Sequence, residues 1–185
     1  MGARRPREPI DRRSGRDDRG APDVTDDVFP DRNMDHLDKI RWIIEEQGWA
    51  AEPVPAVEEP EPQPSYTYTI GFEPTFGSPE VVIIGLRPVA ARGLLGIIAD
   101  QHRAGVSLPV GQLFSGLLDG DLRCCLLDVD PVECGGMFPS LDLINEGGEY
   151  RMQQFVWPDR RGWLPWEEHY EERLRLAQPI IGTWS

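Results

Sequence analysis

Two strand patterns separated by a short loop constrain the fold of this chain more than any other feature. Residues 66–72 alternate between apolar and small or polar side chains, which is typical of a strand with one buried face. Residues 80–86 follow after a loop rich in Pro and Gly, and their unbroken Val-Val-Ile-Ile run indicates a central strand covered on both faces. No crossover helix separates the two strands, which favours an antiparallel or mixed sheet.

Two longer helices are predicted by apolar residues at helical spacing. Asp35 can cap the first helix and Gly48 can end it, while Pro88 can occupy the first turn of the second. Gly93 and Gly96 weaken the second helix by about 1 kcal/mol each relative to Ala. Close packing of this helix against the sheet would account for both glycines.

Shorter elements complete an α+β pattern. Further strands are predicted at 122–129 and 150–157, and short helices at 139–145 and 167–176. Adjacent strands without crossover helices indicate an antiparallel or mixed sheet of about four to six strands, with helices packed mainly on one side. Residues 53–64 are rich in Pro and Glu, and we expect them to form an exposed loop.

The first 33 residues differ in composition from the remainder. They hold eight Arg and eight acidic residues but few apolar side chains, so they cannot bury enough surface to offset the entropy of ordering. We expect residues 1–33 to be a disordered N-terminal extension and residues 34–185 to be a single α+β domain. Because the first helix pattern begins directly after Met34, that residue is a candidate start, which an intact mass of the native protein would test.

Charge and cysteine content narrow the class of partner and the cellular setting. The net charge of −13 opposes binding to a phosphate backbone, so we expect no nucleic-acid partner. No apolar run approaches the length of about 18 residues that a membrane helix needs, so we expect no membrane insertion. Three Cys without a Cys-x-x-Cys pair favour a reducing cytoplasm.

Several short motifs are shared with a known family. They are Glu45-Glu-Gln-Gly-Trp49, Tyr68-Thr-Ile-Gly-Phe72, Gly77-Ser-Pro-Glu80, Gln154-Phe-Val-Trp-Pro-Asp159 and Gly162-Trp-Leu-Pro-Trp-Glu167. On these motifs the chain, from about Met34 to Ile181, resembles the bacterial domain-of-unknown-function family 4262. The resemblance implies no activity, substrate or cofactor. Ser78 departs from the pattern, because members often carry His there.

The last two motifs gather the side chains best suited to chemistry. These are Trp157, Asp159, Trp166, Glu167 and His169. Two carboxylates and an imidazole so close in sequence can form an acid–base site or hold a divalent metal. The same residue types also suit a purely structural role, because Asp159 and Gly162 favour a tight turn and Glu167 favours the first turn of a helix.

Other residues add a second candidate and exclude several reaction classes. Tyr68 can act as an acid or orient a ligand, although alternating aromatic residues on a strand are commonly core. The phosphate-binding, dinucleotide, Gly-x-Ser-x-Gly and His-Glu-x-x-His signatures are absent from the sequence. With three His in the chain we expect no metal centre and no cofactor.

These observations leave three functional hypotheses open. The first is a binding or regulatory module that uses segment 157–167, with Gln154, Trp157, Trp163 and Trp166 contacting a protein partner or a small molecule. The second is a small hydrolase-like enzyme in which Asp159 or Glu167 is the acid–base residue, assisted by Tyr68 or His169; it requires these side chains to converge. The third, supported by acidity alone, is an immunity or toxin-neutralising protein.

Overall fold

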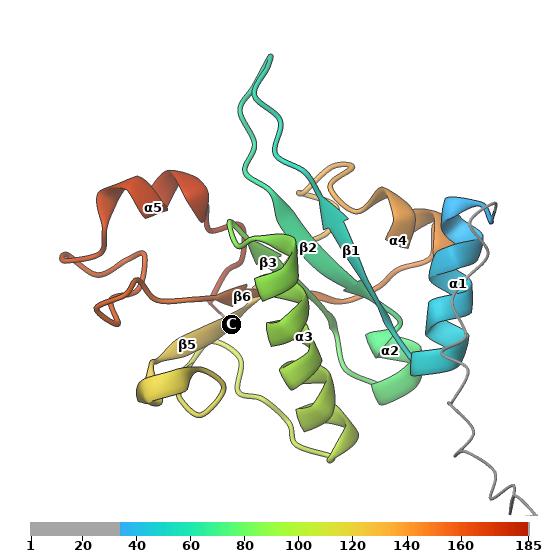
Figure 1. Cartoon of the computed structure of the whole chain (residues 1–185), viewed down its shortest axis with the longest axis horizontal. Coiled ribbons are helices and arrows are strands. Elements are labelled where there is room, and N and C mark those ends of the chain that lie inside the picture. The colour runs from blue at the N-terminus through green and yellow to red at the C-terminus, as the bar shows by residue number, and fades with distance from the viewer. Residues whose placement is uncertain (1–33, 185) are drawn as a thin grey trace, which may run out of the picture.

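A single mixed sheet organises residues 34–184, which are the residues described by the structure, a computed structural model (Figure 1). The strands, in chain order, are β1 (Ala50–Val54), β2 (Tyr66–Ile70), β3 (Glu80–Ile84), β4 (Leu113–Phe114), β5 (Cys124–Val129) and β6 (Met152–Val156). The helices are α1 (His36–Gln47), α2 (Phe72–Phe76), α3 (Pro88–Arg103), α4 (Pro139–Ile144) and α5 (Glu172–Ala177), with a 3-10 turn at Asp119–Asp121. The predicted disorder of residues 1–33 lies outside the described residues.

The sheet consists of two antiparallel ladders joined by one parallel pair. Its order is β1-β2-β3-β6-β5-β4, and every neighbouring pair is antiparallel except β3 and β6. In that parallel pair Val82 lies opposite Gln154. The predicted α+β class with a mixed sheet is confirmed, and the strands predicted at 66–72 and 80–86 form the antiparallel pair of β2 and β3.

Different elements cover the two faces of the sheet. Helix α3 packs on the face that carries Val81 and Ile83 of β3. Helices α1 and α4 pack on the face that carries Val82 and Ile84. The helices are therefore divided between both faces, which differs from the arrangement mainly on one side that the sequence suggested. The reason is that β3 is apolar on both faces, so each face has to be covered.

The predicted ends of the first helix are confirmed, whereas the reason proposed for two glycines is wrong. Asp35 accepts a hydrogen bond from the Leu37 N–H at 3.0 Å, and Gly48 ends α1 with φ of 85°. In α3, however, a Cβ added at Gly93 or Gly96 would meet no atom within 4 Å. Neither glycine therefore allows a close approach of α3 to the sheet.

The Pro- and Glu-rich residues 53–64 belong to a long hairpin. Its first strand, β1, pairs with β2 as far as the contact of Val54 with Tyr66, and Val57 pairs with Gln63 beyond it. Figure 1 shows this hairpin projecting away from the body of the molecule. Residues 53 and 54 thus belong to β1, whereas residues 55–63 form the exposed loop that the composition predicts.

A buried carboxylate fixes the turn between β2 and α2. Glu80 is 1% exposed and accepts hydrogen bonds from the Thr69 hydroxyl at 2.6 Å, from the Gly71 N–H at 2.9 Å and from the Glu73 N–H at 3.2 Å. Burial raises the pKa of Glu80 above its ordinary value, although these hydrogen bonds oppose the rise. Two of the shared motifs therefore meet in one structural contact at the start of β3.

Candidate functional site

Segment 157–167 leaves the end of β6 and folds over the outer part of the sheet. Its Leu164 is fully buried and packs with Cys125, Leu127 and Val156. This contact continues the face covered by α1 and α4, so the segment takes the place of a helix on β5 and β6. The predicted helix at 167–176 begins only at Glu172, because turns occupy the residues before it.

Asp159 organises a tight turn through its backbone and its carboxylate. Its N–H donates to the Trp163 carbonyl at 2.7 Å, and its carbonyl accepts from the Gly162 N–H at 3.0 Å. The carboxylate, in a residue 3% exposed, accepts backbone N–H groups of Arg161 at 2.8 Å, Trp163 at 3.0 Å and Glu171 at 3.2 Å. Burial alone would raise the pKa of Asp159, but the three N–H donors outweigh it, so the pKa lies below its ordinary value.

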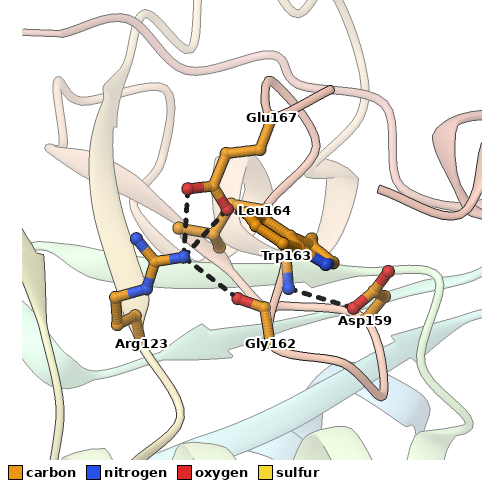
Figure 2. A network of polar contacts seen from close by, with 6 residues as sticks. All are labelled: Arg123, Asp159, Gly162, Trp163, Leu164 and Glu167. Carbon is orange, nitrogen blue, oxygen red and sulfur yellow. Dashed lines mark hydrogen bonds and ion pairs between the residues drawn. The ribbon is translucent and has the colours of Figure 1, made fainter. Parts of the chain in front are cut away.

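Glu167 closes the same turn from the other side (Figure 2). Both carboxylate oxygens lie 3.0 Å from Arg123 Nη2, and one of them accepts the Leu164 N–H at 2.7 Å. Arg123 Nη2 also donates to the Gly162 carbonyl at 3.2 Å. Glu167 and Asp159 thus hold opposite ends of one loop, and neither presents an open carboxylate as a general base would.

Gln154 ties the last residues of the chain to β6. It is completely buried, and its Nε2 donates to the Pro179 carbonyl at 2.8 Å. Its Oε1 accepts the N–H groups of Ile181 at 2.8 Å and Gly182 at 3.1 Å. The side chain that the sequence suggests as a ligand contact is therefore engaged by the chain itself.

Trp157 is fixed by a reciprocal contact from the same tail. Its N–H donates to Gln178 Oε1 at 2.9 Å, and Gln178 Nε2 donates back to the Trp157 carbonyl at 2.9 Å. The indole Nε1 donates to the Ile84 carbonyl at 2.9 Å. A Cβ on Gly85, which has φ of +84°, would lie 2.2 Å from the Ala177 carbonyl oxygen, so only glycine fits beneath the tail.

The other two tryptophans and the histidine lie nearer the surface. Trp166 is 39% exposed and packs edge-on against Trp184, which is 53% exposed, with ring centroids 4.9 Å apart. Trp163 is half-buried and makes a similar contact with the exposed His169 at 5.0 Å. The segment therefore presents aromatic surface to solvent in spite of its buried turn.

A hollow of about 310 Å³ beside the Asp159 turn brings the predicted Asp159 and His169 together with arginines that the sequence interpretation missed. Its lining consists of Asp159, Arg160, Arg161, His169, Glu171 and Arg173. Arg173 pairs with Glu171, whereas Arg160 forms no ion pair or hydrogen bond with any residue from 34 to 184. The adjacent Arg160-Arg161 pair in an acidic chain was the available signal, but the return of Arg173 to the same place depends on the fold.

Tyr68 does not join this group. It lies in the core beneath α4, 5.2 Å from the Phe138 ring centroid, and is fully buried. Burial raises the pKa of Tyr68 to about 12, and the charge of Glu52 adds to the rise, while a contact with Ser140 opposes it. Of the four residues proposed for a hydrolase, Asp159, Glu167 and His169 lie in one loop region, and Tyr68 does not.

Potential nucleophiles elsewhere offer little support for covalent chemistry. Burial raises the pKa of Cys124 to about 12 and that of Cys125 to about 11, so both thiols stay protonated at neutral pH. Ser78 Oγ lies 3.2 Å from His102 Nδ1, but this pair packs beside Phe72 and Phe76 without a third catalytic group. Within residues 34–184, no cluster of His, Cys, Asp and Glu has the makeup of a metal site. In the same range no helix combines the length and apolarity needed to cross a bilayer.

Comparison with known proteins identifies one relationship. Searches of curated proteins and of solved structures find no match to this chain. A family model described as "Domain of unknown function (DUF4262)" matches residues 43–171. The match includes the Glu80 contact and the Asp159 turn. The chain therefore belongs to the DUF4262 family.

Proposed function

We propose that this protein is a non-catalytic binding module whose contact surface is built on segment 157–167. The observation that carries the proposal is the orientation of its side chains. Asp159 and Glu167 point inward and accept hydrogen bonds from the chain, whereas Arg160, Arg161 and Trp166 face solvent. Trp and Arg are the residue types that most often dominate the binding energy of protein interfaces.

The Trp166–Trp184 pair supplies the apolar part of this surface. The two indoles already contact each other edge-on, which reduces the side-chain entropy that binding would cost. The turn that precedes Trp166 in the chain is fixed by Asp159 and Arg123, which gives the segment a defined shape. A rigid scaffold that presents an exposed aromatic pair suits a protein partner.

The cellular location and two alternative functions are also proposals. A cytoplasmic location is supported by the free thiols of Cys124, Cys125 and Cys134. For an enzyme, the observations are less favourable, because the two carboxylates already have structural partners. For an immunity role, acidity remains the single argument.

The test uses the full chain as bait with three variants. Trp166→Ala and Trp184→Ala should each weaken partner binding by roughly 30-fold, as expected for a residue worth about 2 kcal/mol. Val132→Ala is the matched control, since Val132 is an exposed apolar residue (87%) outside this surface. Partner affinity that is unchanged in both Trp variants, with thermal midpoints preserved, would refute the proposal.

A further inference from the structure

A hollow beside the Asp159 turn is lined by three arginines. Arg160 and Arg161 line it from one stretch of chain, and His169 and Arg173 line it from another. We propose that this hollow binds a phosphomonoester group. The inference rests on the proposed function, because it assigns a ligand chemistry to the same binding surface.

The charge balance at the hollow is opposite to that of the protein. Three arginines and two acidic residues line it, so the lining has a net positive charge even though the chain carries −13. Asp159 already accepts three backbone N–H groups, and Glu171 is paired with Arg173. The guanidinium groups of Arg160 and Arg161 are therefore the cations best able to accept a new anion.

The geometry favours phosphate over carboxylate. A phosphomonoester presents three negatively charged or acceptor oxygens, and arginine donates to such groups through paired N–H bonds. A carboxylate has two oxygens and can satisfy one guanidinium fork fully. Three arginines around one hollow match the larger number of acceptors.

The volume sets the size of the ligand. At roughly 30 Å³ for each water in the liquid, 310 Å³ corresponds to about ten water molecules. This exceeds the space that a phosphate ion needs and leaves room for the carbon atoms attached to it. The ligand is thus an ester of phosphate with a small organic group, either free or as a phosphorylated side chain.

The repulsive charge of the remaining protein makes the site selective. The chain carries a net charge of −13, which opposes the general approach of anions, although salt screens this field beyond about 10 Å. Binding should therefore be confined to the hollow and show one saturable site. A second, weak and non-saturating association would indicate general attraction to arginines.

The experiment titrates the full chain with glycerol 3-phosphate and with N-acetylphosphoserine amide, using calorimetry, and with acetate as the control anion. The double variant Arg160→Ala/Arg161→Ala should weaken phosphate-ester binding at least 10-fold. The double variant Arg87→Ala/Arg92→Ala is matched in charge, because both residues are exposed and lie outside the hollow, and it should bind as the native chain does. The ester that binds more tightly distinguishes a free phosphate ester from a phosphorylated side chain.

Three results would overturn the inference: no binding of either ester at millimolar concentration, equal binding of acetate, or equal losses in the two double variants. Failure of this inference is separable from failure of the proposed function. Trp166→Ala should keep phosphate-ester binding and lose the protein partner. If phosphate esters do not bind but Trp166→Ala still releases the partner, this inference alone fails; if the esters bind but Trp166→Ala retains the partner, the proposed function alone fails.

Discussion

Replacing Gln154 with alanine is the sharpest test of how the C-terminal tail is held. The side chain makes three hydrogen bonds, one to the Pro179 carbonyl and two from the Ile181 and Gly182 N–H groups. Each is worth about 1 kcal/mol net, so Gln154→Ala should lower the free energy of unfolding by about 3 kcal/mol. For a domain of this size the thermal midpoint should fall by roughly 6–12 °C.

Gln153→Ala is the matched control, because the two residues are neighbours on one strand and face opposite sides of it. Gln153 makes one side-chain hydrogen bond, to Asp128 at 3.2 Å, so its loss should cost about 1 kcal/mol. Gln154→Glu provides a second arm. It keeps the shape of the side chain but replaces the donor that faces the Pro179 carbonyl with an oxygen, so it should be destabilised at least as much as Gln154→Ala.

Urea denaturation followed by tryptophan fluorescence measures all three variants. Limited proteolysis should show the tail beyond Ala177 cleaved faster in both Gln154 variants than in Gln153→Ala. The reasoning would be refuted if Gln154→Ala lost no more stability than Gln153→Ala, because the tail would then be held by contacts other than these hydrogen bonds.

Three further predictions concern close packing and buried carboxylates. Gly85→Ala should lower the free energy of unfolding by about 2 kcal/mol or more, because the added Cβ would lie 2.2 Å from the Ala177 oxygen at positive φ. Gly93→Ala, whose Cβ would stand in open space, should raise the free energy of unfolding by about 1 kcal/mol. Equal effects of the two variants in urea denaturation would contradict this prediction. Burial raises the pKa of Glu80, so the folded state holds this proton more tightly than the unfolded chain does. Stability should therefore fall as pH rises above 4.5, the ordinary pKa of a glutamate. If Glu80→Gln showed the same slope of stability against pH, Glu80 would be excluded as the cause of that slope. The backbone N–H donors outweigh burial at Asp159 and lower its pKa. Its contribution to stability is therefore present above pH 3.8 and is lost as pH falls through the folded-state pKa. Asp159→Asn should reduce the loss of stability at acidic pH, measured as denaturation midpoints over a pH series.

Local signals predicted the elements that depend on local physics. The caps Asp35 and Gly48 fix the ends of α1, because a side-chain acceptor and a left-handed glycine satisfy helix ends whatever the tertiary context. The apolar run in β3 likewise required cover on two faces. Strand β1 was missed, since Pro53 and its acidic neighbours resemble a loop until β2 supplies a partner.

The candidate site was harder to predict, because the same residue types serve turns and catalysis. Asp159 and Glu167 differ from acid–base residues only in what their oxygens contact, and those contacts are backbone N–H groups and Arg123. The hollow depends on Arg173 returning beside Arg160, which no local pattern encodes. The sequence left a structural and an acid–base role open for Asp159 and Glu167, and their contacts in the structure are those of the structural role.

The single parallel pair, β3 with β6, separates the sheet into two antiparallel ladders. On one side of it lies the ladder β1-β2-β3 with α3, and on the other the ladder β4-β5-β6 with the tail. The connection at residues 104–107 is exposed throughout. We expect a chain cut there to give two fragments, each with a complete antiparallel ladder, whose reassociation would re-form the central pair and the core beneath α3. The fold is thus suited to fragment complementation, in which neither half forms the complete sheet without the other.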